Sequence, residues 1–318
     1  MKNRGSVRVE RRILADGTTK EYRYQRKRRR PTSSRTVRGV IAAWQQSPEW
    51  ETLRPKTVTS YTTYLHPFFE ALGHFDIRQV RRRHLLAIRD SVAKTRGHGA
   101  AIGFCRAVSA LFKWLLDRDM VETSPTSNLR RSLRHGTLPT WTEDQAQRAM
   151  RDLPELYRRV VVLAYHTGQR RGDLCAMRWS DYDGAAIRVR QEKTRERLEI
   201  PVAPELRAEL DAWKRVARSV LILETQLGLP WVPDYLSRTL PYELRKIGLP
   251  HQLGIHGLRK LTAVRLAEAG CSAHEIAAIT GHRTLAMVQH YTQAANQRTL
   301  SNAAVIKLEQ RRRTKIQS

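Results

Sequence analysis

The stretch from residue 256 to residue 291 constrains the fold most, because its helix signals are short and end sharply. Leucine and valine residues at a spacing of three follow His256 and predict a helix that stops at Gly270. Ser272 and Glu275 form an S-x-x-E capping box, which predicts a second helix that ends at Gly281. Short helices of this kind can bring side chains that are far apart in the sequence to one point.

Four side chains of this stretch suit the chemistry of a phosphodiester. They are the imidazoles of His256 and His282, the guanidinium of Arg259 and the phenol of Tyr291. A guanidinium can contact two nonbridging phosphate oxygens at once. A phenol has a pKa near 10, so its attack at neutral pH needs a positive pocket and a proton acceptor. We therefore expect one site that attacks a phosphate and holds its charge.

The order H-x-x-R, then G-H, then a tyrosine nine residues later resembles the C-terminal signature of the tyrosine recombinases, the phage-integrase family. The upstream sequence T-G-Q-R-R-G-D-L at 167–174 is similar to the family's T-G-x-R-x-x-[E/D]-L box. Lys193 lies in a predicted hairpin turn, where the family carries its catalytic lysine. Each motif alone is weak, whereas the ordered set over about 120 residues is specific.

Six residues match the catalytic positions of the family, and a seventh supports them. They are Arg170, Lys193, His256, Arg259, His282 and Tyr291, with Asp173 in support. By this resemblance Tyr291 is the nucleophile, and Arg170 and Arg259 hold the negative charge that develops on the phosphate. His256 is then the acid/base partner of the phenol, and His282 donates a hydrogen bond to the phosphate.

The resemblance also implies the course of the reaction. Tyr291 attacks the scissile phosphate to form a 3′-phosphotyrosine, and Lys193 protonates the departing 5′-oxygen. The 5′-hydroxyl of a second strand reverses the step, and strands exchange through a Holliday junction. Asp173 orients the cluster by hydrogen bonding and takes no direct part in proton transfer.

No motif for a nucleotide or a metal accompanies these residues in the sequence. The phosphate-binding pattern G-x-x-x-x-G-K-[ST] is absent. His274 and Glu275 begin like the zinc-protease pattern H-E-x-x-H, but position 278 is alanine, and no carboxylate cluster suits magnesium. We therefore expect a reaction that uses no metal, no ATP and no other cofactor.

The charge balance of 58 Lys and Arg against 30 Asp and Glu gives a formal net charge of +28. This charge indicates a polyanionic partner, which we expect to be double-stranded DNA. The sequence has no uninterrupted apolar stretch of the roughly 20 residues that a membrane span needs. Three scattered cysteines are typical of reduced thiols. We expect a cytoplasmic protein, associated with the nucleoid when bound to DNA, with no membrane partner.

The 318 residues are enough for roughly two domains of ordinary size. Residues 1–34 form a basic arm whose alternation predicts a short β-hairpin. Residues 35–131 carry the apolar stripes of a helical domain, which by resemblance is the core DNA-binding domain. A linker at 132–138 leads to the catalytic domain and its C-terminal tail at 139–318.

The expected fold class is mainly α, a two-domain DNA clamp. It combines the helical core-binding domain with a mixed α+β catalytic domain that contains a small antiparallel sheet. Residues 186–190 and 197–201 alternate with period two and predict the hairpin of that sheet. Thr142 and Gln145 predict a capping box at the first helix of the catalytic domain. A short amphipathic helix is expected at 300–308.

Basic residues of the helical domain lie opposite its apolar stripes and are candidates for contacts with DNA phosphates. These candidates are Lys56, Arg81, Arg82, Arg83, Lys94, Arg96, Arg106 and Lys113.

The resemblance predicts a site-specific recombinase, the integrase of a phage, prophage or mobile element. By the same resemblance it works as a homotetramer on two duplexes, and an accessory directionality or DNA-bending protein remains open. A chromosome-dimer resolvase or invertase is the rival function within the family. Two rivals outside it are a type IB topoisomerase-like enzyme and a non-catalytic DNA-binding regulator on the same fold. The target site, the cleavage spacing and the role of the arm do not follow from the sequence.

Overall fold

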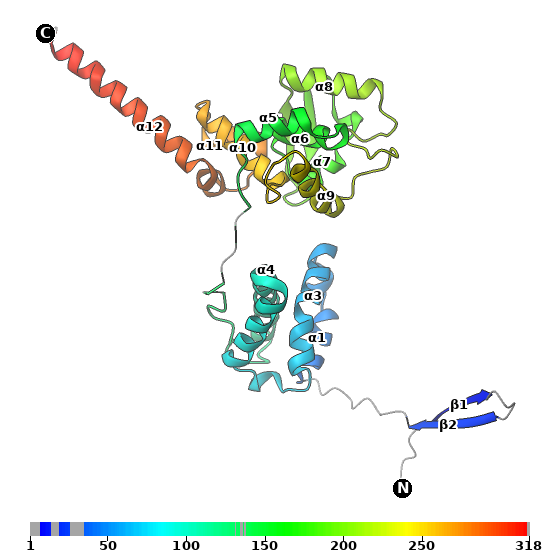
Figure 1. Cartoon of the computed structure of the whole chain (residues 1–318). Helices are drawn as coiled ribbons and strands as arrows, with labels where there is room; N and C mark the ends of the chain where they lie inside the picture. Colours follow the sequence, from blue (N-terminus) through cyan, green and yellow to red (C-terminus); the bar gives the residue numbers. More distant parts are fainter. Residues whose placement is uncertain are drawn as a thin grey trace. The chain divides into compact units, whose positions relative to one another are not determined.

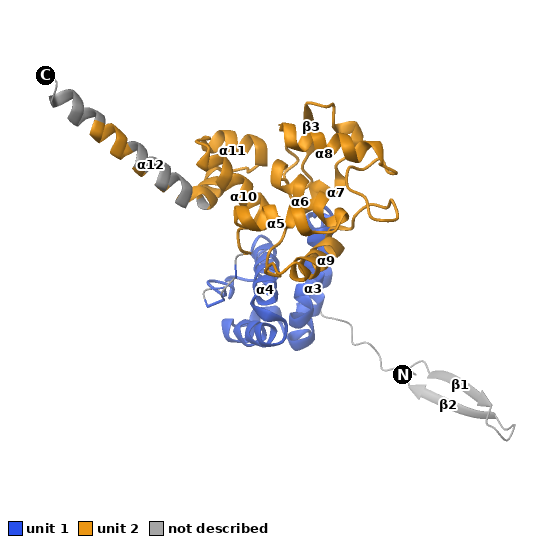
Figure 2. Ribbon diagram, turned by 45° about the horizontal axis from the view of Figure 1, so that its top comes forward, with its two compact units in different colours: residues 1–136 blue, residues 137–318 orange. Residues whose placement is uncertain are grey.

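The computed structural model describes residues 7–13, 19–25, 35–130, 132–133, 136 and 138–316. The chain divides into two compact units, 1–136 and 137–318, which are described separately (Figures 1 and 2).

The basic arm contains the hairpin that its alternation predicts. Strands β1 (Val7–Ile13) and β2 (Thr19–Gln25) pair in antiparallel fashion, with Val7 opposite Gln25 and Ile13 opposite Thr19. The residues between the two strands, 14–18, and those that follow the hairpin, 26–34, lie outside the described residues.

Residues 35–130 of the first unit are mainly helical. Their elements are α1 (Val37–Gln45), α2 (Pro48–Glu51), α3 (Pro55–Leu72), the 3-10 turn η1 (Ile77–Gln79) and α4 (Arg82–Leu116). Side-chain caps fix two of the starts: the hydroxyl of Thr36 accepts from the Gly39 amide at 3.1 Å, and that of Ser47 from the Trp50 amide at 3.4 Å. Each cap satisfies a backbone donor that the first helical turn leaves unpaired.

Helix α4 forms the centre of the first unit. Gly97 interrupts it with a φ of 82°, so two helical segments meet there at a kink. Among the described helices, α4 is the one that is long and apolar enough to cross a membrane. Its Phe104, Val108 and Leu111 are nevertheless fully buried within the unit, which is the position of a core helix.

The second unit contains nine described helical segments and one two-stranded antiparallel sheet. In chain order these are α5 (Glu143–Asp152), α6 (Glu155–Thr167), α7 (Arg171–Ala176), η2 (Trp179–Asp181), β3 (Ala186–Arg190), β4 (Arg197–Pro201), α8 (Pro204–Arg215), α9 (Pro233–Lys246), α10 (Ile255–Glu268), α11 (Ala273–Thr280) and α12 (Leu285–Ile316), with η2 of the 3-10 type. The mainly α class with a small sheet is confirmed.

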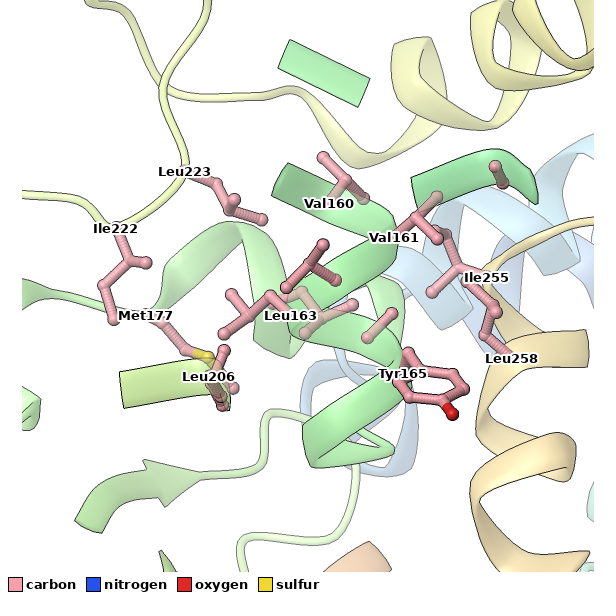
Figure 3. Close-up of a cluster of buried hydrophobic side chains, with 14 of the residues drawn as sticks. Val160, Val161, Leu163, Tyr165, Met177, Leu206, Ile222, Leu223, Ile255 and Leu258 are labelled. Carbon is pink, nitrogen blue, oxygen red and sulfur yellow. The ribbon is translucent and has the colours of Figure 1, made fainter. Parts of the chain in front are cut away.

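Helix α6 is the core of the second unit. Its run of Val160, Val161, Val162 and Leu163 is buried on all sides, as expected of a helix that is apolar all round. Figure 3 shows Val160, Val161 and Leu163 among Leu258 of α10, Leu206 of α8 and residues of the neighbouring loops. Burial of each such side chain stabilises the fold by roughly 1.5–3 kcal/mol. This packing holds α6 and α10 together. Arg170 follows shortly after the end of α6, and His256 and Arg259 lie on the first turns of α10.

The C-terminal helix differs from the short one expected at 300–308. Helix α12 runs without a break from Leu285 to Ile316. No glycine or proline occurs within that range, so the helix has no breaker at which to stop. The amphipathic segment is therefore part of one long helix, and its Val305, Ile306 and Leu308 are exposed.

Candidate active site

The end of helix α6 places Arg170. Gly168 has a left-handed φ of 62°, which ends the helix and turns the chain, so that Arg170 becomes the N-cap residue of α7. Its Nη1 donates to Oε1 of Gln191, and its Nη2 donates to the carbonyl of Gly281 at 3.3 Å. Burial lowers the pKa of the Arg170 guanidinium, and the nearby Asp173 partly offsets this. Arg170 is thereby fixed between the hairpin and the end of α11.

Arg259 lies on the first turns of α10 and is only 1% exposed. Its Nη1 donates to the carbonyl of Gly168 at 2.9 Å and to the carbonyl of Thr280. Its Nη2 is buried and has no hydrogen-bond partner among the described residues. Burial, followed by the charge of Arg170, lowers the pKa of Arg259 to about 9, so the side chain remains a cation at neutral pH.

His282 follows the left-handed cap of α11 at Gly281, whose φ is 69°. The side chain is buried, and its Nδ1 lies 2.7 Å from the hydroxyl of Thr280. Burial first, and then the charges of Arg259 and Arg170, lower the pKa of His282 to about 3. The imidazole is therefore neutral at physiological pH.

His256 stands near the start of α10 and remains exposed at one side. Partial removal from water lowers its pKa, and the positive charges of Lys260, Arg259, Arg170 and Lys193 lower it further. A histidine with a lowered pKa is neutral at pH 7 and can accept a proton.

Tyr291 lies in the second turn of α12, which packs against α10 and α11. Buried Val288, one turn earlier, anchors this part of the helix. The ring of Tyr291 has its centroid 6.1 Å from that of His256 and 5.6 Å from that of His282. The Nζ of Lys260 lies 5.5 Å from the same centroid. The structure thus brings the predicted nucleophile to both predicted histidines.

The hairpin turn between β3 and β4 carries Lys193, which is exposed. Asp173 is buried, and its Oδ1 accepts from the backbone amide of Glu192 at 2.8 Å. Its Oδ2 lies 3.9 Å from Nη1 of Arg170. Burial raises the pKa of Asp173, against the effects of the Glu192 amide and Arg170. Asp173 therefore joins α7 to the turn, and Lys193 stands at the edge of the site.

Several residues of this pocket were not identified from the sequence. Gln191 is fully buried and contacts Arg170, and Thr280 contacts both Arg259 and His282. Lys260 is buried beside Tyr291. Its Nζ donates to the carbonyl of Leu138 at 2.7 Å. One signal was available for Gln191, because period-two alternation in β3 directs positions 187, 189 and 191 inward.

The eight basic residues proposed for phosphate contacts in the first unit are all exposed. Among the described residues of the chain, no group of three or more His, Cys, Asp or Glu side chains could hold a metal ion.

The model of the phage integrase family matches residues 140–298, half of the chain and most of the second unit. The chain belongs to the phage integrase family. Tyrosine recombinase XerC of Mycobacterium tuberculosis is 28% identical over 238 residues, which cover 66% of this chain and 79% of that protein. The integrase of Escherichia phage HK022 is 24% identical over 253 residues, which cover 75% of this chain and 70% of that integrase.

Solved structures of this family share the fold. A lambda integrase fragment, 75–356, in a dimer bound to a COC′ core site has a TM-score of 0.68 at 23% identity, over 79% of this chain and 97% of that chain. The Tn1549 transposon integrase in complex with circular intermediate DNA has a TM-score of 0.70 at 16% identity, over 80% of this chain and 94% of that chain. The tyrosine recombinase family expected from the sequence motifs is confirmed.

Proposed function

We propose that the chain is a site-specific DNA recombinase, the integrase of a phage, prophage or related mobile element. The observation that carries this proposal is the buried Nη2 of Arg259, a charged donor without a hydrogen-bond partner among the described residues. A buried charged donor that is left unpaired is costly, so the site suits an anionic ligand. A phosphodiester fits, since Arg170 and the phenol of Tyr291 lie in the same pocket.

In the nucleophilic step, the imidazoles of His256 and His282 lie beside the ring of Tyr291. The phenol oxygen attacks the scissile phosphorus, and the lowered pKa of His256 leaves its imidazole neutral and able to take the phenol proton. The guanidiniums of Arg170 and Arg259 stabilise the charge that develops on the nonbridging oxygens. Neutral His282, held by Thr280 at 2.7 Å, orients a hydrogen bond toward the same phosphate.

The leaving group is a 5′-oxygen, which needs a proton as its bond to phosphorus breaks. Lys193 supplies this proton from the hairpin turn, which Asp173 holds through the Glu192 amide. The product is a 3′-phosphotyrosine, which conserves the energy of the broken bond. The 5′-hydroxyl of a second strand then attacks this linkage and regenerates the phenol, so that partners exchange through a Holliday junction without ATP.

The partner in this proposal is double-stranded DNA. The formal charge of +28 and the exposed basic residues of the first unit support it. Related structures include a lambda integrase tetramer bound to a Holliday junction, and we propose a homotetramer on DNA for this chain as well. The proposed location is the cytoplasm, with the DNA-bound form on the nucleoid.

A resolvase of the XerC type is the second candidate, because XerC proteins are among the relatives. The hairpin of β1 and β2, which precedes the helical domain, favours the integrase. Sequencing of the flanks of the gene distinguishes the two, since an integrated element leaves a direct repeat at its borders.

A nicked suicide substrate that carries the element's own attachment site tests the chemistry. The wild-type chain should form a covalent adduct, and Tyr291→Phe should form none while it keeps its DNA affinity. The matched control Tyr235→Phe, in an exposed tyrosine of α9, should react as the wild type does. Absence of the adduct with wild-type protein supports a non-catalytic regulator instead. A paired-site exchange assay separates recombination from simple DNA relaxation.

A further inference from the structure

A buried glutamine connects the hairpin turn to the arginine pocket. Gln191 follows β3 directly and precedes Lys193 by two residues. It is fully buried together with Ile187 and Val189, which share its face of the strand. The carboxamide therefore enters the pocket, whereas Lys193 stays exposed on the turn.

The carboxamide of Gln191 uses its whole hydrogen-bonding capacity. Its Oε1 accepts from Nη1 of Arg170 and, at 2.7 Å, from the hydroxyl of Thr194. Its Nε2 donates to Oε1 of Gln169 at 2.7 Å and to the carbonyl of Thr280 at 2.9 Å. A primary amide offers two donor hydrogens and two acceptor positions, so these four bonds fix its orientation. A buried network that is fully satisfied is rigid.

The turn that carries Lys193 is held on both sides of that residue. Asp173 accepts from the backbone amide of Glu192 at 2.8 Å, and the side chain of Thr194 donates to Gln191. The end of α11 closes directly on the carboxamide, since a Cβ at Gly281 would clash with Nε2 of Gln191. Gln191 is thus bonded to the turn, to Arg170 and to α11 at once.

We propose that Gln191 is a positioning residue that holds the Lys193 turn in register with Arg170. The proton donor for the leaving oxygen and the cation for the phosphate then act on the same phosphorus atom. This inference rests on the role proposed above for Lys193. Because Gln191 is buried, it acts through these two residues and does not contact DNA itself. A misplacement of about 1 Å at such a site lowers the rate by about 100-fold.

The test compares single-turnover cleavage of two nicked substrates by the full chain. One substrate carries the natural 5′-oxygen at the scissile phosphate, and the other carries a bridging 5′-sulfur. A thiol has a pKa near 8.5, so the thiolate leaves without the proton that an alkoxide needs. Gln191→Met keeps the side-chain length and removes all four bonds. We expect it to cleave the oxygen substrate about 10–100-fold more slowly at unchanged DNA affinity, and to regain at least about tenfold on the sulfur substrate.

Thr194→Val is the second variant, because it removes one bond to Gln191 and preserves side-chain volume. It should show the same pattern with a smaller loss, which keeps the test valid if Gln191→Met does not fold. Gln226→Met, in an exposed loop glutamine, is the matched control and should cleave both substrates at the wild-type rate. Wild-type cleavage by Thr194→Val or Gln191→Met, or a loss that the sulfur substrate does not restore, overturns the inference.

Lys193→Ala separates this inference from the proposal on which it rests. If wild type forms no adduct, the proposed function itself fails. If the sulfur substrate does not restore Lys193→Ala, the role of Lys193 fails and the inference fails with it. If sulfur restores Lys193→Ala but not Gln191→Met, the inference alone is wrong.

Discussion

Arg259 donates from Nη1 to the carbonyl of Thr280, at the last residue of α11. The same carbonyl accepts from Gln191, and the hydroxyl of Thr280 lies 2.7 Å from Nδ1 of His282. The last carbonyls of a helix have no partner within it and carry partial negative charge. Two helix C-termini, of α6 at Gly168 and of α11 at Thr280, therefore orient the Arg259 guanidinium through Nη1, while its Nη2 stays buried without a hydrogen-bond partner among the described residues.

Arg259→Lys should lower the single-turnover cleavage rate by about 100–1,000-fold, the usual cost of one lost transition-state donor. A lysine has one ammonium group, which cannot bind both carbonyls and also present a planar pair of donors. DNA affinity, measured by fluorescence anisotropy, should change little. Arg265→Lys, on the same helix but stacked 3.7 Å over the ring of Tyr165, is the control. A cleavage rate within a few-fold of wild type for Arg259→Lys contradicts the role given to Nη2.

Gly281→Ala should impair cleavage, whereas Gly270→Ala should not. Both glycines have a left-handed φ, of 69° and 87°, so both variants bear the conformational cost of about 1–2 kcal/mol. A Cβ at Gly281 also clashes with the carboxamide of Gln191, while nothing lies within 4 Å of one at Gly270. Urea unfolding and suicide-substrate cleavage measure the two effects. Equal cleavage rates for both variants would contradict the close contact between Gly281 and the Gln191 carboxamide that accepts from Arg170.

Lys260→Met should move the acid limb of the cleavage rate to higher pH. Burial lowers the pKa of the His256 imidazole, and the positive charge of Lys260 lowers it further. Removal of that charge therefore lets the pKa of His256 rise toward its ordinary value. The imidazole must be neutral to accept the phenol proton, and the rate would then fall at a higher pH. Single-turnover rates from about pH 5 to pH 8 measure the shift. Lys246→Met, in an exposed lysine of α9, should keep the wild-type midpoint.

His282→Gln should make the free energy of unfolding less dependent on pH in acid. The unfolded histidine titrates near 6.5, but burial and two arginines lower the folded pKa to about 3. Between these values the unfolded state binds a proton that the folded state does not, so wild-type stability falls as pH falls through this window. His166 and His256 act with the same sign, so the slope should decrease without vanishing. Urea titrations at several pH values within this window check the change in slope.

Replacement of the adjacent Arg81, Arg82 and Arg83 by glutamine should weaken DNA binding and flatten its salt dependence. Each neutralised phosphate contributes about −0.9 to the slope of log K against log salt, so the triple variant should lose up to about three such increments. Arg78→Gln is the control, because Asp76 already neutralises Arg78 at 2.6 Å. If the slope of log K against log salt is unchanged in the triple variant, these arginines do not contact DNA phosphates.

Local signals account for the parts of the site that could be predicted. The Ser272–Glu275 box is present, with Ser272 N to Glu275 Oε2 at 2.6 Å, and Gly281 ends α11 in the left-handed conformation as expected. Such signals act within one turn of chain, so a single sequence reveals them. Period-two alternation in β3 indicates only that Gln191 points inward. Its partners come from the meeting of β3, α7 and α11, which no spacing rule encodes. Lys260 was missed for a similar reason, since a lysine on a helix is usually solvated and this one reaches Leu138.

The ligands that hold the cations of the pocket are largely main-chain oxygens. Gly168, Thr280 and Gly281 supply them for the two arginines, and Leu138 supplies one for Lys260. A peptide oxygen persists whatever side chain occupies its position. Substitution of a side chain at one of these positions therefore leaves the anchoring oxygen itself in place, provided that Gly168 and Gly281 keep their left-handed conformation.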